Sequence, residues 1–375
     1  MKNIRCHAAL HRTSRPAASS ANRSLALIPA LAVTLLSSCS ICRYDMTTTV
    51  REDLSVDRRI CAEADSSYLA GDKTSSPFEF ALTEPWAVKT LDIPYNADFN
   101  GETARMNVLA VRRFAPGERL CVGLATGDQE GNPLLSPDES VRKSFRWFVT
   151  RYEYRAVYRA VRDFPVPLDS CMTRDGQRLF LMGEDSPAGW SGLELYARLD
   201  ELNSAFVKWT DANVFEVNLS IISRYLPEKH LRLLDLEREK LFGHVRNDES
   251  GLLGMNPREF CRRADEYFVD EPFMSEIYGR YSAEIDSLYA EREKILDYFL
   301  LTFVHEVDLP GRIVSTSAPQ IGENGAARWK VDCCRLLYDD MEVVAESVKV
   351  NVWAVIVTFI VLMGLAWAVI APRRR

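Results

Sequence analysis

One apolar segment constrains this chain more than any other feature. Residues 352–371 read VWAVIVTFIVLMGLAWAVIA, a run of 20 residues without a charged side chain. As a helix this run is about 30 Å long, which matches the hydrocarbon core of a bilayer. Trp353 and Trp367 lie near its two ends, where indole rings prefer the membrane interface. The run predicts a transmembrane helix; the alternative, a helix buried in a soluble core, is disfavoured because few soluble helices are apolar on every face.

The residues after this run orient the predicted helix. The chain ends in a short basic tail at 372–375, which contains Arg373, Arg374 and Arg375. Basic residues next to a transmembrane helix remain preferentially on the cytoplasmic side. We therefore expect a cytoplasmic carboxyl terminus, with everything before Val352 exported.

The amino-terminal residues 1–38 have the layout of a signal peptide. They carry five cations and no acidic residue, and their apolar stretch, Leu25–Leu36, is too short to span a membrane comfortably. The stretch ends in Leu36-Ser37-Ser38-Cys39, which resembles a lipobox, where the cysteine is acylated and becomes the new amino terminus. We predict lipidation of Cys39, palmitate included. An ordinary signal peptide with Cys39 as an unmodified thiol is the alternative.

Composition describes the part between these two ends. The whole chain is 47% hydrophobic and 26% charged, which excludes a disordered or wholly membrane-embedded protein. Residues 1–38 contain five cations and the basic tail contains three, and neither contains an acidic residue. The remaining part of the chain has 38 basic and 53 acidic residues, so the exported part carries a charge near −15. So acidic a body repels nucleic acid and anionic headgroups. Nucleic acid is therefore excluded as a partner.

Hydrophobic periodicity divides the exported part into three. Residues 39–164 and 298–349 alternate with a period of two and predict strands, whereas 165–297 carry apolar stripes at helical spacing. The predicted strands are 47–51, 56–64, 104–114, a long aromatic strand at 145–161, and then 298–309, 312–317, 327–331 and 341–347. In the aromatic strand, Tyr152, Tyr154 and Tyr158 share one face, and Arg151, Glu153, Arg155 and Arg159 the other. The predicted helices begin at about 191 and cover 211–226, 228–242, 256–267 and 273–296. Asn256 followed by Pro257 predicts a helix cap with proline in the first turn. We therefore predict an α+β fold: one β-rich layer from both ends of the ectodomain, an inserted helical segment, and one transmembrane helix at 352–371.

Residues capable of chemistry are few. The exported part has three histidines, at 230, 244 and 305, and no HExxH, GxSxG, Walker or GxGxxG motif. His305 alternates with Phe303 and Val307 and is interpreted as a core histidine, and the pair Asp339-Asp340 as solvated surface. The neighbours Cys333 and Cys334 are expected on opposite faces of a strand, as structural thiols or in separate disulfides. We predict no catalytic, cofactor-binding or metal-binding residue and no cofactor; Cys39 is the single predicted site.

Several features together resemble a set of uncharacterised bacterial lipoproteins that carry a carboxyl-terminal transmembrane helix. They are the lipobox at Cys39, the hairpin at 47–64, the aromatic segment FRWFVTRYEYRAVY, the segments PGRIVSTSA and RWKVD, and the terminal apolar run. The resemblance implies a lipidated body tethered to the bacterial cell membrane, with a periplasmic ectodomain. It supplies no activity and no catalytic residue.

Two classes of function fit these features. The first is a non-catalytic binding or scaffolding module of the cell envelope, which the membrane holds and which contacts an envelope protein. The second is a membrane-tethered hydrolase whose site assembles from distant residues. We favour the first, because no motif raises a catalytic site above background. A deep cleft that collects His305 or two shielded carboxylates would favour the second, and an exposed aromatic patch the first.

Overall fold

A computed structural model describes residues 41–370, apart from 73, 75, 84, 100–101, 122–123, 125–130, 184–188, 247–250, 270–271 and 323. The predicted signal peptide, the lipidation site Cys39 and the basic tail 372–375 lie outside the described residues. These three features stay predictions.

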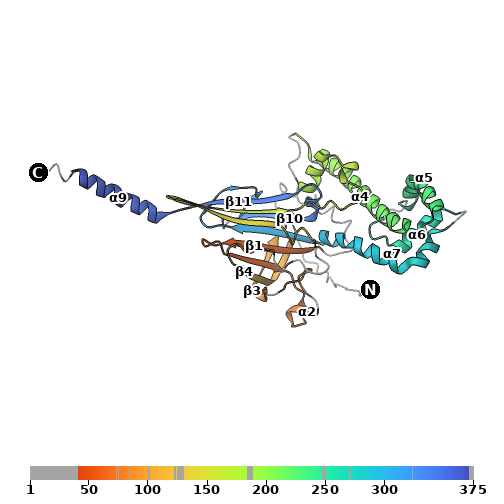
Figure 1. Ribbon diagram of the computed structural model, residues 1–375, viewed down its shortest axis with the longest axis horizontal. Helices are drawn as coiled ribbons and strands as arrows, with labels where there is room; N and C mark the ends of the chain where they lie inside the picture. Colours follow the sequence, from red (N-terminus) through yellow and green to blue (C-terminus); the bar gives the residue numbers. More distant parts are fainter. Residues whose placement is uncertain are drawn as a thin grey trace.

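The described chain is a mixed α+β protein with two sheets (Figure 1). The first sheet has seven strands in the order β3-β4-β2-β1-β7-β10-β9, and the second has four in the order β5-β6-β11-β8. The first-sheet strands are β1 (Cys42–Val50), β2 (Val56–Ala62), β3 (Ala87–Asp98), β4 (Thr103–Phe114), β7 (Leu301–Asp308), β9 (Gln320–Ile321) and β10 (Ala327–Asp332). The second-sheet strands are β5 (Asp138–Arg146), β6 (Val149–Tyr158), β8 (Arg312–Thr316) and β11 (Met341–Val350).

Both sheets join strands from the two β-rich segments that flank the helices, as predicted. β1 pairs in parallel with β7, and β6 pairs antiparallel with β11. The prediction of one β-rich layer is wrong, because the two sheets pack against each other. Tyr154 and Tyr158 of β6 share one hydrophobic core with Phe303 and Val307 of β7. Apolar faces on both sheets therefore cover each other.

The aromatic segment is the second departure from the predicted fold. The single strand predicted over 145–161 is a hairpin, because the chain reverses at Trp147 and Phe148 between β5 and β6. The predicted alternation holds beyond the turn, where Tyr152 and Tyr154 are buried and Arg151 is exposed. No glycine, proline or asparagine marks this reversal, so the sequence carried no turn signal.

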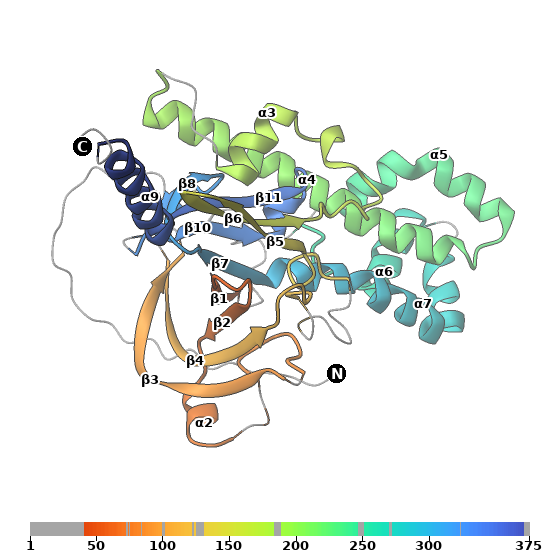
Figure 2. The same ribbon diagram turned by 60° about the vertical axis from the view of Figure 1, so that its left-hand side comes forward.

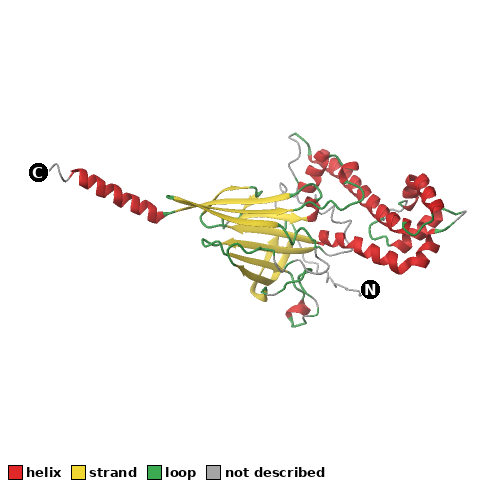
Figure 3. Cartoon of the chain, viewed as in Figure 1, coloured by secondary structure: helices red, strands yellow, loops and turns green. Residues whose placement is uncertain are grey.

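The helices between β6 and β7 form a lobe that extends beyond one end of the sheets (Figure 3). They are α4 (Gly192–Ser223), α5 (Glu228–Val245), α6 (Pro257–Tyr267) and α7 (Met274–Asp297), preceded by η3 (Leu168–Ser170), α3 (Arg174–Gln177) and η4 (Arg178–Met182). In the view of Figure 2, α3 and α4 lie above the strands of the second sheet. Short elements elsewhere are α2 (Ser66–Leu69), η5 (Tyr298–Leu300) and α8 (Cys333–Leu336). Parts of α4 to α7 enclose a hydrophobic core of their own.

Local capping decides where these helices begin. Ser191 and Glu194 form a reciprocal capping box at the start of α4, and the Asn256 side chain caps α6, as its sequence predicts. The predicted break before Asp211 is absent. Its carboxylate instead accepts hydrogen bonds from the Leu252 backbone N–H at 2.7 Å and from Arg246 at 2.7 Å. α4 is therefore one helix of 32 residues.

The carboxyl-terminal helix α9 (Val352–Ile370) follows β11 almost without a linker and projects away from the sheets (Figure 1). β11 continues to Val350, so that Asn351 alone separates strand and helix, where the sequence predicted a linker over 348–351. No helix among the described residues combines the length and the apolar character needed to cross a membrane. The transmembrane segment at 352–371 stays a prediction.

The two ends of the described chain lie at opposite ends of the sheets (Figure 1). β1 starts at Cys42, opposite Leu301, which follows the helical lobe. It ends at the turn that contains Glu52, and Glu52 pairs with Lys349 near the end of β11. Nine residues of strand span about 30 Å. Cys42 and the start of α9 are therefore separated by roughly the length of a strand.

A buried ion pair connects the two sheets. Arg58 of β2 and Glu139 of β5 have side chains only 1% and 2% exposed, and two hydrogen bonds of 3.0 and 2.6 Å join them. Arg58 also donates to the Leu120 carbonyl at 3.0 Å, and Tyr154 donates to Glu139 at 3.1 Å. Each charge therefore has several partners, as a charge removed from water requires.

His305 extends this network, and its predicted place in the core is confirmed. The ring is fully buried, with Nε2 2.9 Å from the Thr48 hydroxyl and Nδ1 3.1 Å from the Tyr158 hydroxyl. Burial, with a smaller effect of the Arg58 charge, holds the pKa of His305 well below its usual value. The imidazole is therefore neutral and serves as a structural link.

Glu139→Ala leaves Arg58 buried without its counter-charge, and we expect it to destabilise the chain by about 3–5 kcal/mol. The control, Glu346→Ala, removes the partner of the half-exposed Arg151 and costs at most about 1 kcal/mol. Urea unfolding of the full chain, followed by circular dichroism, measures both. Equal losses in the two variants would contradict the role assigned to the buried pair.

His305 also gives stability a pH dependence. Its pKa is depressed in the folded state, so below about pH 6.5 the unfolded chain binds a proton that the folded chain does not. Stability is therefore fully present above that pH and falls as the pH drops. Between pH 6.5 and 5 we expect a loss approaching about 1.4 kcal/mol per pH unit from this residue. In His305→Gln, the slope of the free energy of unfolding against pH should diminish by that amount. Identical slopes in both proteins would refute the assignment of this pH dependence to His305.

Candidate functional site

A cavity of about 920 Å³ lies where the second sheet meets the helical lobe. Its walls come from residues 159–165 after β6, from α4, and from the last turns of α7. Gly131, Pro133 and Tyr298 complete the lining. Cavities of this volume are typical of small-molecule sites.

One wall of the cavity is apolar. Val214, Val217 and Ile221 recur at spacings of three and four residues, which places them on one face of α4. Leu288 of α7 and Phe164 add further apolar surface to the lining. A ligand that buries apolar area therefore has a wall to pack against.

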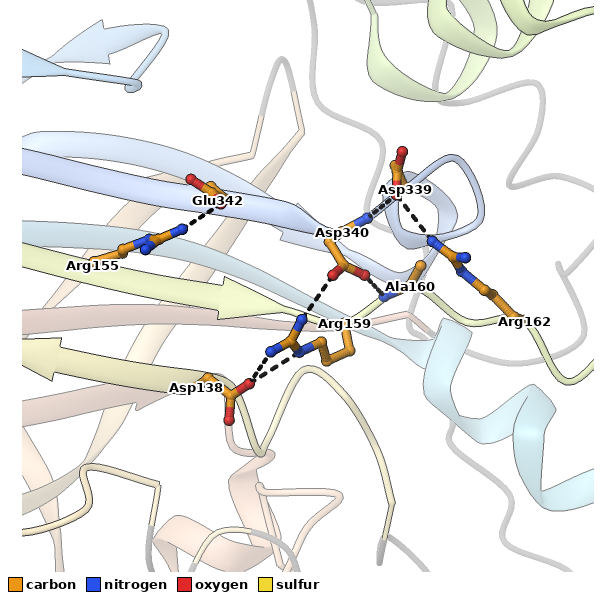
Figure 4. Close-up of polar contacts among 8 residues, drawn as sticks. All are labelled: Asp138, Arg155, Arg159, Ala160, Arg162, Asp339, Asp340 and Glu342. Carbon is orange, nitrogen blue, oxygen red and sulfur yellow. Dashed lines mark hydrogen bonds and ion pairs between the residues drawn. The ribbon is translucent and has the colours of Figure 1, made fainter.

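Ion pairs order the strand edge of the cavity (Figure 4). Arg159 donates to Asp138 at 3.0 and 2.6 Å and to Asp340 at 3.0 Å. Asp340 also accepts the Ala160 N–H at 2.8 Å, which, with Arg159, holds the pKa of its carboxyl below the usual value. Arg162 pairs with Asp339 at 3.1 Å. These contacts tie the start of β5, the end of β6 and the segment before β11 into one edge.

Two charged side chains of the lining take no part in such ion pairs. The exposed guanidinium of Arg224 has no ion pair within the described part of the chain. Glu293 is partly buried, and burial, with a smaller effect of Asp297, raises the pKa of its carboxyl. By contrast, Arg292 lies 3.4 Å from Asp163, and Lys294 lies 3.2 Å from Glu291. Arg224 is therefore a cation ready for an anionic group, and Glu293 is a carboxyl that is easily neutralised.

Of the residues singled out from the sequence, only Asp339 and Asp340 lie near this cavity, at its edge. Asp339 and Asp340 are solvated, as predicted, but they also hold the strand edge in place through Arg162 and Arg159. Arg159 and Arg162 were missed as site residues. Alternation placed Arg159 on a polar strand face, and pairing across some 180 residues has no local signal.

The histidines are dispersed. The His230 ring stacks on Phe273 with centroids 4.0 Å apart, and the His244 ring lies 5.6 Å from that of Tyr267. Both belong to the helical lobe, whereas His305 is sealed between the sheets. No described histidine lines this cavity, and His305 is fully buried away from it.

None of the seven described cysteines forms a disulfide. Cys333 and Cys334 lie in α8, not in the predicted strand, although they still point into different clusters. Burial raises the pKa of Cys334 to about 12, and it also raises the pKa of Cys333. A thiol so rarely ionised is a poor nucleophile and a poor metal ligand. Among the described residues no cluster suited to a metal ion is found.

In comparison with known proteins, no family model, no curated protein and no solved structure matches the chain. The resemblance to membrane-tethered lipoproteins therefore stays a prediction, and the site is argued from its residues alone.

Proposed function

We propose that this chain is a membrane-anchored binding module of the bacterial cell envelope, with its ectodomain on the periplasmic side. The observation that carries the proposal is the cavity between sheet and helices, which combines an apolar wall on α4 with the unpaired cation Arg224. This combination suits an amphipathic ligand with an anionic group, either a small molecule or a segment of an envelope protein.

The anchor in this proposal is α9. The apolar run in the sequence extends from Val352 to Ala371, whereas the side chains of α9 are described only to Ala368. Large apolar side chains along α9 are about half exposed or more, among them Phe359 and Leu365. A continuous apolar surface of this kind is unstable in water, and a lipid bilayer would cover it. In the same proposal, acylation of Cys39 adds a second attachment.

Binding is favoured over hydrolysis because of the state of the carboxylates. Glu293 is the shielded carboxyl of the described lining, whereas Asp163 and Glu291 have side chains 84% and 72% exposed and face cations. A pair of carboxyls with opposed protonation states, as general acid and base chemistry requires, is not assembled in the described lining. We therefore retain the hydrolase as the less supported alternative.

Val217→Trp should fill the cavity, because the indole extends from the apolar wall of α4. We expect it to weaken binding of anilinonaphthalene sulfonate, an apolar anion, by at least fivefold, and Arg224→Gln to weaken it by about as much. Fluorescence titration of the full chain in lipid nanodiscs, corrected with empty nanodiscs, measures this. Val269→Trp, at a position 75% exposed and outside the cavity lining, is the control. Unchanged affinity in Val217→Trp would exclude this cavity as the site.

Retention in the membrane tests the anchor. In a Cys39→Ala background, which removes any acyl chain, we expect the full chain to resist alkaline carbonate extraction. Val361→Arg with Leu365→Arg places two charges in the apolar run and should release most of the protein, because each costs about 3 kcal/mol in the bilayer centre. Val269→Arg, in the helical lobe, should release none. Release of the Cys39→Ala chain itself would contradict anchoring by α9.

A further inference from the structure

An exposed aromatic cluster lies at the tip of the β5–β6 hairpin. Phe145, Trp147 and Phe148 have 56%, 48% and 49% of their surface exposed. Trp353, in the first turn of α9, joins them: its ring stacks on Phe145 with centroids 6.3 Å apart and meets the edge of Trp147 at 5.3 Å. A cluster of large exposed rings, unlike a single one, indicates an interaction surface.

The cluster is rigidly connected to α9. Asn351 donates its backbone N–H to the Phe148 carbonyl at 2.9 Å, and its side-chain amide donates to the carbonyls of Arg146 and Trp147 at 3.0 and 3.2 Å. Its amide oxygen accepts from the Thr150 hydroxyl at 2.9 Å. Asn351 is itself 9% exposed. The tip and the helix therefore keep a fixed relation to each other.

The depth of the tip follows from one further contact. The indole N–H of Trp147 donates to the Thr358 hydroxyl at 2.8 Å. Thr358 is six residues into α9, so Trp147 lies about 9 Å along the helix from its start. Elements that lie in a membrane interface are buried to about 5–10 Å. If α9 enters a bilayer at Val352, Trp147 and Phe148 reach the interface, which indole rings prefer.

Two exposed arginines lie at this end of the second sheet, although the body as a whole is acidic. Arg146 ends β5, and Arg312 begins β8, opposite Val348 of β11. Both are exposed, and their guanidinium groups have no ion pair within the described ranges. Lys349 and Arg151 lie at the same end, paired with Glu52 and Glu346. The second sheet thus brings two unpaired guanidinium groups from separate strands to the end that carries α9, and such cations attract anionic headgroups.

We infer that the β5–β6 tip is a second membrane-contacting element, inserted into the bilayer interface beside α9. The inference rests on the proposed anchoring by α9 and adds the orientation of the body. Because the tip and α9 are rigidly connected, the sheets stand upright, with their strands running away from the membrane surface. The cavity then lies at the far end of β6, roughly 30 Å from the bilayer surface.

An upright body also separates the two proposed attachments. Cys42 lies at the end of β1 remote from α9, about 30 Å away, and the three residues back to Cys39 extend at most about 10 Å. Even with these residues fully extended, the sulfur of Cys39 remains about 20 Å short of the bilayer that holds α9.

Photo-crosslinking to lipid tests the inference. The full chain with Cys39→Ala is placed in vesicles of phosphatidylcholine with 30% phosphatidylglycerol that contain a labelled phosphatidylcholine. A benzophenone amino acid replaces Phe148, Phe359 or Leu193 in separate preparations. Phe359 reports on α9, and Leu193 is 78% exposed in the helical lobe. We expect lipid adducts at 148 and 359, and at least fivefold less adduct at 193.

The outcomes separate the inference from the function it rests on. Lipid adducts at 359 but not at 148 overturn the inference and leave the anchor intact. Adducts at neither position overturn both. A protein adduct at 148, to a second copy of the chain, replaces the bilayer with a protein partner and also overturns it. An adduct at 193 equal to that at 148 would show a body lying along the membrane and would overturn the upright orientation. If the inference holds, Arg146→Gln with Arg312→Gln should lower the yield at 148 severalfold in these vesicles, but not in pure phosphatidylcholine.

Discussion

The buried pair of Arg58 and Glu139 is the interaction on which the arrangement of the two sheets depends. A guanidinium and a carboxylate this deeply buried are tolerated only if each meets the other in good geometry. The pair therefore fixes the position of β2 relative to β5. The Leu120 carbonyl, Tyr154 and Thr48 satisfy the remaining donors and acceptors, and Thr48 in turn contacts His305. The positive charge of Arg58 also helps to keep that histidine neutral.

The two ends of the second sheet carry different groups of side chains. At one end, ion pairs between Arg159, Asp138 and Asp340 order the edge of the cavity (Figure 4). At the other end, Asn351 locks the aromatic hairpin tip to α9. Paired strands are stiff along their length, so a group bound at one end is held at a set distance from the other. The proposed anchor and the proposed ligand site are separated by this strand length.

Sequence reasoning succeeded where a signal is local. The cap at Asn256 and the alternation of Tyr152, Tyr154 and Tyr158 were predicted correctly, because neighbours along the chain determine both. It failed at Trp147, where the chain reverses without a turn residue, and at Asp211, which resembles a helix start but binds a distant backbone. The cavity was not foreseen at all, since its lining is drawn from residues 131 to 298.

By itself, the sequence determined the strand-rich ends, the helical segment between them, the burial of His305 and the apolar character of residues 352–370, because periodicity and composition follow from the side chains in order. The tertiary structure alone decided that the strands form two sheets, that Arg58 meets Glu139, and that Arg146 and Arg312 gather at the end that carries α9. It also placed Cys42 at the end opposite α9. These are relations between residues up to some 300 positions apart. They depend on how apolar faces and buried charges satisfy one another in space, and a one-dimensional pattern does not encode that.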